Sequence, residues 1–260
     1  MHGESQFLPV GSGPAGRRIA FRRAAPVRPG LPGVVWLGGF KSDMDSTKAI
    51  ALDKHCRSRG QAFLRFDYSG HGASSGAFEE GTITRWLDET LAVFRSQTEG
   101  PQILVGSSMG GYLALLAARA LEQAGEAARL AGMVLIAPAV DFTEKLIWER
   151  APEAARRAIL QTGVWRRPSA YASEPYPITR ALIEDGRKHL LLGKDIVRSH
   201  CAARILQGMQ DEDVPYHHAM TLIEHMAADP VALTLIRDGE HRLSRPQDLA
   251  LLYEALDAYS

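Results

Sequence analysis

The stretch Gly106-Ser107-Ser108-Met109-Gly110 decides the fold that this sequence predicts. An apolar run, Ile103-Leu104-Val105, precedes it, and a helical pattern that begins near Tyr112 follows it. Strand, G-x-S-x-G and helix in this order are typical of a nucleophile elbow, a tight turn that exposes the hydroxyl of its central serine. Ser108 is therefore the candidate nucleophile. A glycine turn without catalytic function would share the pattern, so the rest of the chain has to supply the other catalytic groups.

The chain supplies an acid and a histidine where an elbow-type hydrolase requires them. In such enzymes the acid and then the histidine follow the last two strands of the sheet. Asp211 lies in the turn after the first of these expected strands, and His241 lies in the loop after the second. We expect His241 to accept the proton of Ser108 and Asp211 to fix the tautomer of the imidazole. Glu212 and Asp213 stand beside Asp211 and are alternatives for the acid.

The stretch Gly38-Gly39-Phe40-Lys41 is the candidate donor loop of an oxyanion hole. It follows the apolar run 34–37, which is where the second oxyanion donor of such enzymes lies. We expect the backbone N–H groups of Phe40 and Met109 to form the pair of donors, with Gly39 in the substrate pocket. The alternative is a glycine turn that only leads into the next helix.

Two further polar clusters have structural interpretations. The turn 67–72, with the sequence Asp-Tyr-Ser-Gly-His-Gly, is expected to brace the elbow rather than to supply catalytic groups. Asp43 and Asp45 precede a helix that begins at Ser46 or Thr47, so we expect them to cap that helix.

Apolar runs alternate with helical patterns along most of the chain. This alternation predicts an α/β fold with a mostly parallel central sheet that is flanked by helices on both faces. A hairpin of two short strands opens the chain. The strands expected after it are 34–37, 62–66, 102–105, 133–136, 203–206 and 231–236, and the helices expected beside the elbow helix are 46–59, 82–97, 217–227 and 246–259.

Residues 139–200 break the alternation, because they contain no clear strand and their prolines divide short helical pieces. We expect a small helical lid inserted into an α/β core that residues 1–138 and 201–260 form. Trp148 and Trp165 are more apolar than a solvated insertion requires, and we expect them to border an acyl-binding pocket. The alternative is that they only attach the lid to the core.

The composition limits the class of partner. The chain has 260 residues, 45% of them hydrophobic, and its 30 Lys and Arg balance its 30 Asp and Glu. This balance argues against nucleic acid and favours a small-molecule or acylated substrate. Cys56 and Cys201 lack the spacing of a metal site, so neither a metal nor a cofactor is expected. The sequence does not decide between a monomer and a homodimer.

The arginines within residues 17–28 superficially resemble those of an organelle transit peptide. They fit the solvated faces of two short strands better. The sequence has no apolar run of about 18 residues, the minimum for a membrane span. We therefore expect a cytoplasmic protein that is not an integral membrane protein.

A set of short sequence words that spans almost the whole chain is similar to one group of hydrolases. On these words the sequence resembles the α/β-hydrolase fold serine hydrolases and, among them, the mitochondrial palmitoyl-protein thioesterase group, whose members are also described as acyl-glucuronide esterases. The resemblance implies a triad of Ser108, Asp211 and His241 and the hydrolysis of thioesters or esters with an acyl chain. That group's long targeting extension is missing here, in line with a cytoplasmic location. The words are 39–40, 42–44, 47–49, 65–70, 78–80, 100–108, 163–165, 208–209, 214–215 and 241–242.

The sequence therefore predicts a serine hydrolase that forms an acyl-enzyme at Ser108 without a metal or cofactor. One alternative is a small-molecule carboxylesterase with no preference for thioesters. The other is a ligand-binding protein of the same fold that does not catalyse a reaction.

Overall fold

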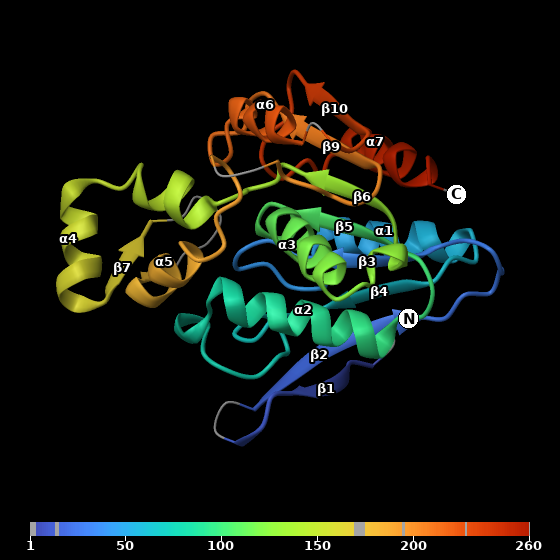
Figure 1. Ribbon diagram of the computed structural model, residues 1–260, viewed down its shortest axis with the longest axis horizontal. Helices are drawn as coiled ribbons and strands as arrows, with labels where there is room; N and C mark the ends of the chain where they lie inside the picture. The colour runs from blue at the N-terminus through green and yellow to red at the C-terminus, as the bar shows by residue number, and fades with distance from the viewer. Residues whose placement is uncertain (1–3, 14–15, 169–174, 194–195, 227, 260) are drawn as a thin grey trace.

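An eight-stranded sheet organises the molecule (Figure 1). The computed structural model describes residues 4–13, 16–168, 175–193, 196–226 and 228–259. The strands of this sheet are β1 (Gln6–Val10), β2 (Arg17–Ala24), β3 (Gly33–Leu37), β4 (Phe63–Phe66), β5 (Gln102–Ser107), β6 (Leu130–Ile136), β9 (Ala203–Gly208) and β10 (Val231–Ile236). Their order is β1-β2-β4-β3-β5-β6-β9-β10. The β1–β2 and β2–β4 pairs are antiparallel, and the other pairs are parallel.

Helices cover both faces of the sheet because successive strand residues point to two separate cores. In β3, Val34 and Trp36 belong to one core, whereas Val35 and Leu37 belong to the other. The first core is closed by α1 (Thr47–Ser58) and α7 (Pro246–Asp257), and the second is closed by α2 (Ile83–Gln97), α3 (Met109–Gln123) and α6 (Tyr216–His225). The expected α/β class with a mostly parallel sheet is confirmed, and the expected core elements lie within three residues of their observed ends.

The chain between β6 and β9 lies beyond the carboxyl ends of the parallel strands (Figure 1). It contains a π-helical segment (Thr143–Trp148), α4 (Glu153–Thr162), β7 (Val164–Arg167), β8 (Tyr176–Thr179) and α5 (Arg180–Gly186). β7 and β8 form an antiparallel pair, so the expectation that this segment contains no strand was wrong. Each strand has only four residues and β8 includes Pro177, which makes the period of two hard to recognise in the sequence.

Within the described ranges, none of the helices has the length and apolar character needed to cross a membrane.

Candidate active site

Ser108 stands at a strained turn between β5 and α3, with φ of 54° and ψ of −117°. A serine adopts a positive φ only at a cost in free energy, so the surrounding structure has to hold it there. The Ser108 backbone N–H donates to the carbonyl oxygen of Ile136 in β6 at 2.8 Å. The two flanking glycines are sterically required, because a Cβ on Gly106 would collide with the Gly110 carbonyl and one on Gly110 with the Leu37 carbonyl.

A continuous chain of hydrogen bonds links three side chains that are far apart in the sequence. The Nε2 atom of His241 lies 3.1 Å from the Oγ of Ser108, and its Nδ1 lies 2.8 Å from Oδ2 of Asp211. The Asp211 carboxylate is fully buried, whereas the His241 side chain is 17% exposed. With the ring proton on Nδ1, Nε2 is left as an acceptor for the serine proton. The structure thus brings all three predicted triad residues together.

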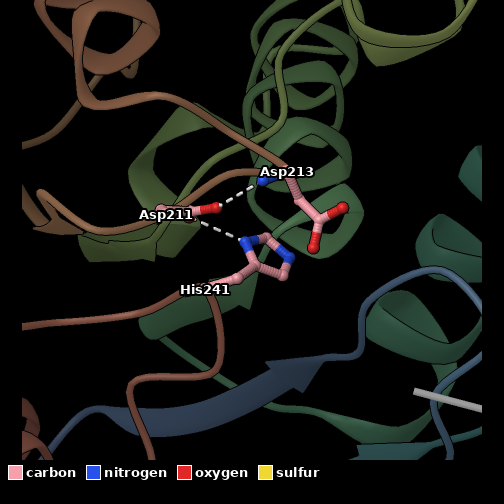
Figure 2. Close-up of side chains that lie close together, drawn as sticks. All are labelled: Asp211, Asp213 and His241. Atoms are coloured by element: carbon pink, nitrogen blue, oxygen red, sulfur yellow. Dashed lines mark hydrogen bonds and ion pairs between the residues drawn. The ribbon is translucent and has the colours of Figure 1, made fainter. Parts of the chain in front are cut away.

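The choice among the three acidic residues is decided by geometry. Asp211 points its carboxylate at the His241 ring, while Asp213 uses its backbone N–H to donate to the other carboxylate oxygen of Asp211 at 3.0 Å (Figure 2). The backbone of Glu212 accepts a hydrogen bond from Arg150 at 3.2 Å. Asp211 is therefore the acid that this arrangement offers to the histidine.

The same place holds a group of potential metal ligands. Asp211, Asp213 and His241 bring one ligand atom each within 4.8 Å of one another. A metal there would have to displace the bond between Asp211 and Nδ1 of His241, and Asp211 already accepts from three N–H donors, those of Gln207, Asp213 and Val214. The donor set therefore fits a hydrogen-bonded acid and histidine better than a metal site.

The loop after β3 approaches the elbow closely at Gly39. A Cβ on Gly39 would lie 3.5 Å from the Cβ of Ser108, which shows how near this backbone comes to the nucleophile. The Phe40 ring packs edge-on against Phe78 at 4.9 Å and tilted against Phe142 at 5.6 Å. Met109 is the first residue of α3, where backbone N–H groups have no partner within the helix. Both expected donors therefore belong to segments that lie next to Ser108.

His71 fixes the conformation of this loop. Lys41 has a positive φ of 62°, and its backbone N–H donates to Nε2 of His71 at 3.1 Å. The Nδ1 of His71 lies 3.2 Å from the carbonyl oxygen of Ser69 and carries the ring proton. Burial lowers the pKa of His71 to about 4, which keeps the ring neutral and Nε2 free to accept. The turn 67–72, which was expected to brace the elbow, thus braces the donor loop.

The carboxylates expected to cap α1 have other partners. Oδ1 of Asp45 pairs with Arg65 at 2.8 Å and with Arg22 at 2.5 Å, and Oδ1 of Asp43 accepts from the Asp45 backbone N–H at 2.9 Å. The first turn of α1 contains no acid. The capping prediction was wrong because the fold buries Arg65, whose charge takes Asp45 as its counterion.

Two cavities meet at Ser108 and His241. The larger, about 350 Å³, is lined mostly by polar residues, among them Ser46 and Lys48, and also by Gly39. The smaller, about 160 Å³, has mainly apolar walls. Its apolar lining consists of Phe40, Ala139, Phe142, Leu146, Ile147, Pro168, Ile178 and Val214.

The two tryptophans expected at the pocket lie elsewhere. Neither Trp148 nor Trp165 is among the described residues that line the two cavities, and both pack against the main core. Trp148 also stacks under the guanidinium of Arg187, 5.0 Å from its ring centre. Tyr176 and Ile178 of β8 line the apolar cavity instead, and this short strand left no clear signal in the sequence.

The fold and the site together define an α/β-hydrolase of the serine hydrolase class. Residues 34–248 match the family described as serine aminopeptidase, S33, and the chain belongs to this family. It is 36% identical to the mitochondrial palmitoyl-protein thioesterase ABHD10 of Bos taurus over 227 residues, which cover 87% of this chain and 72% of the relative. The expectation of an enzyme of this class is thereby confirmed.

Solved structures of hydrolases are also similar to this chain over nearly its whole length. A protein of Agrobacterium vitis S4 that is named as a hydrolase superposes on this chain with a TM-score of 0.94, at 47% identity and 98% coverage of both chains. Alpha/beta hydrolase domain-containing protein 10 from mouse superposes with a TM-score of 0.85, at 32% identity and 98% coverage of both chains.

Proposed function

We propose that this protein hydrolyses acyl thioesters or carboxylic esters through an acyl-enzyme on Ser108. The observation that carries the proposal is the hydrogen-bonded chain from Ser108 through His241 to the buried Asp211, placed at the mouth of an apolar cavity. The relatives named as palmitoyl-protein thioesterases support an acylated substrate.

The reaction follows from the positions of these groups. His241 takes the proton of Ser108 at Nε2 as Oγ attacks the acyl carbon, and Asp211 stabilises the resulting imidazolium. The N–H groups of Phe40 and Met109 stabilise the oxyanion. Collapse of the tetrahedral intermediate breaks the bond to the thiol or alcohol, which leaves with the proton from His241. A water molecule, deprotonated by His241, then attacks the acyl-enzyme and releases the carboxylic acid and Ser108.

The apolar cavity is the place for the acyl chain. Its walls come partly from the segment 139–200, including Phe142 and Ile147, and partly from Val214 next to the acid. We assign this segment the role of a lid over the core of residues 1–138 and 201–260. Each methylene of a substrate that enters the cavity contributes about 0.8 kcal/mol to binding.

The location of the protein in the cell remains a prediction. We expect a cytoplasmic protein, whereas the relatives' names contain the word mitochondrial, which argues against this expectation.

Covalent labelling tests the nucleophile. A fluorophosphonate probe should label the wild-type protein and fail to label Ser108→Ala, while Ser107→Ala should still be labelled. Hydrolysis of matched thioesters and oxygen esters should follow the labelling. Labelling that is lost in Ser107→Ala and kept in Ser108→Ala would refute the assignment, and a wild-type protein that is never labelled would favour a ligand-binding function.

A further inference from the structure

The polar cavity is a second space beside the nucleophile, next to the apolar cavity that we assign to the acyl chain. It extends from Ser108 and His241 toward the first residues of α1 and has a volume of about 350 Å³. Its wall contains Trp36 from the end of β3, and Ser46 and Lys48 from the start of α1. The three side chains carry hydrogen-bond donors at a place where the enzyme has to accommodate a second part of its substrate.

The indole N–H of Trp36 is an unpaired buried donor. The residue is 1% exposed, and Nε1 has no hydrogen-bond partner among the described atoms. A Cβ built on Gly38 would lie 3.8 Å from Nε1, which places the indole N–H close to the start of the donor loop. Buried N–H groups are nearly always paired, because an unpaired one has lost its water without a replacement. A ligand oxygen in this cavity would supply the acceptor.

Ser46 has a second unpaired polar atom on the same wall. It is the N-cap residue of α1, a position where serine ordinarily accepts a hydrogen bond from the first turn of the helix. Here the side chain makes no capping bond, and its Oγ is buried without a partner among the described residues. Because Ser46 also lines the cavity, a molecule bound there would supply the missing partner.

Lys48 gives this wall a positive charge. Its Nζ donates to the carbonyl oxygen of Arg242 and lies 3.5 Å from the Oγ of Ser244. Both acceptors are uncharged, while the carboxylates of Asp248, Glu240 and Asp211 favour the charged form of this ammonium group. Burial lowers the pKa of Lys48 to about 8, so the group is still mostly charged at neutral pH.

We propose that the polar cavity binds the leaving group of the substrate and favours leaving groups that carry a hydrogen-bond-accepting oxygen, with Trp36 and Ser46 as its donors. The proposal rests on the proposed acyl transfer at Ser108. In that reaction the acyl chain and the leaving group are attached to the same carbon, so two cavities that meet at Ser108 receive one each. The accepting oxygen is an amide carbonyl or a carboxylate, and Lys48 adds attraction for the latter.

Three thioesters with one octanoyl chain test the proposal. Their thiols are N-acetylcysteamine, which has an amide, 3-mercaptopropionate, which has a carboxylate, and butanethiol, which has no accepting oxygen. The ratio of kcat/KM between variant and wild type is compared for each ester, because this ratio cancels differences in chemical reactivity. Trp36→Phe and Ser46→Ala should each lose about 3- to 10-fold more on an oxygen-bearing thiol than on butanethiol. The ester with the larger selective loss identifies the amide or the carboxylate as the ligand.

The rate of deacylation distinguishes a damaged structure from a lost subsite, because a structural defect would lower this rate as well. The acyl-enzyme no longer holds the thiol, so the single-turnover rate of deacylation should be the same for the three esters and should survive in both variants. Ser58→Ala, an exposed serine at the far end of α1, is the matched control and should change none of the ratios. Ser46 lies outside the two hydrophobic cores. The Ser46→Ala variant therefore keeps the test valid if Trp36→Phe does not fold.

Equal losses on all three esters would overturn the subsite, since they would leave Trp36 and Ser46 with a structural role only. Such a result would leave the proposed function intact, because the wild type would still turn over every ester. Failure of the proposed function has a different signature: the wild type would cleave none of the three esters and Ser108 would resist the fluorophosphonate, which would overturn both proposals.

Discussion

Replacement of Asp211 by Asn tests the hydrogen-bonded chain most directly, because the surroundings of this carboxylate fix the orientation of the new amide. The Oδ1 atom accepts from the backbone N–H of Asp213 at 3.0 Å and of Val214 at 2.8 Å. An asparagine has to keep its oxygen on these two donors, since its NH₂ group would otherwise face both of them. The NH₂ group then takes the place of Oδ2 and donates to Nδ1 of His241.

This donation reverses the tautomer of His241. The ring proton moves to Nε2, which then donates to Ser108 and can no longer accept the serine proton. Loss of the correct tautomer costs on the order of 10⁴ in rate, or about 5.5 kcal/mol in the barrier. The fold should change little, because the only bond lost is the 3.3 Å contact from Gln207 to Oδ2, with a cost of about 1 kcal/mol.

The assay is the hydrolysis of p-nitrophenyl butyrate together with the rate of fluorophosphonate labelling. Asp213→Asn is the matched control, because it keeps the backbone N–H that donates to Asp211. It should lose far less activity than Asp211→Asn. A larger loss in Asp213→Asn, or near-normal rates in Asp211→Asn at an unchanged melting temperature, would refute the reasoning.

Three other predictions concern the pocket, the donor loop and the lid. Ile147→Ala, which shortens a buried side chain of the apolar cavity, should weaken decanoyl binding by about 2 kcal/mol and butyryl binding by less; equal losses in kcat/KM would remove Ile147 from the acyl site. Burial lowers the pKa of His71 from 6.5 to about 4. Between these two pH values, His71 is mostly protonated in the unfolded chain and mostly neutral in the folded chain. The free energy of unfolding in urea should therefore fall as the pH drops from 6.5 to 4, and the fall should be smaller in His71→Gln; an equal fall would assign it to another group. Trp165→Ala should lower the melting temperature and reduce activity equally on short and long acyl chains, whereas a selective loss on long chains would place Trp165 in the pocket.

The sequence by itself determined the parts of this protein that depend on neighbours along the chain. The elbow is such a part, because a positive φ at Ser108 and the close approach at Gly106 and Gly110 are requirements of a few consecutive residues. The alternation of apolar runs with helical patterns likewise predicted the sheet, since each strand and helix buries a face that its own residues define. His241 followed from the order of these strands, which also placed the acid in the turn that holds Asp211, Glu212 and Asp213.

The tertiary structure alone decided what depends on segments that meet from far apart. The apolar cavity joins Phe142 and Tyr176 from the insertion to Val214 of the core, and side-chain direction rather than hydrophobicity excludes Trp148 and Trp165 from its described lining. In the same way, the turn 67–72 supports the donor loop instead of the elbow. Asp45 turns to Arg65 instead of capping α1. A buried donor or charge takes whichever partner the fold places within about 3 Å, and no pattern in the sequence states that distance.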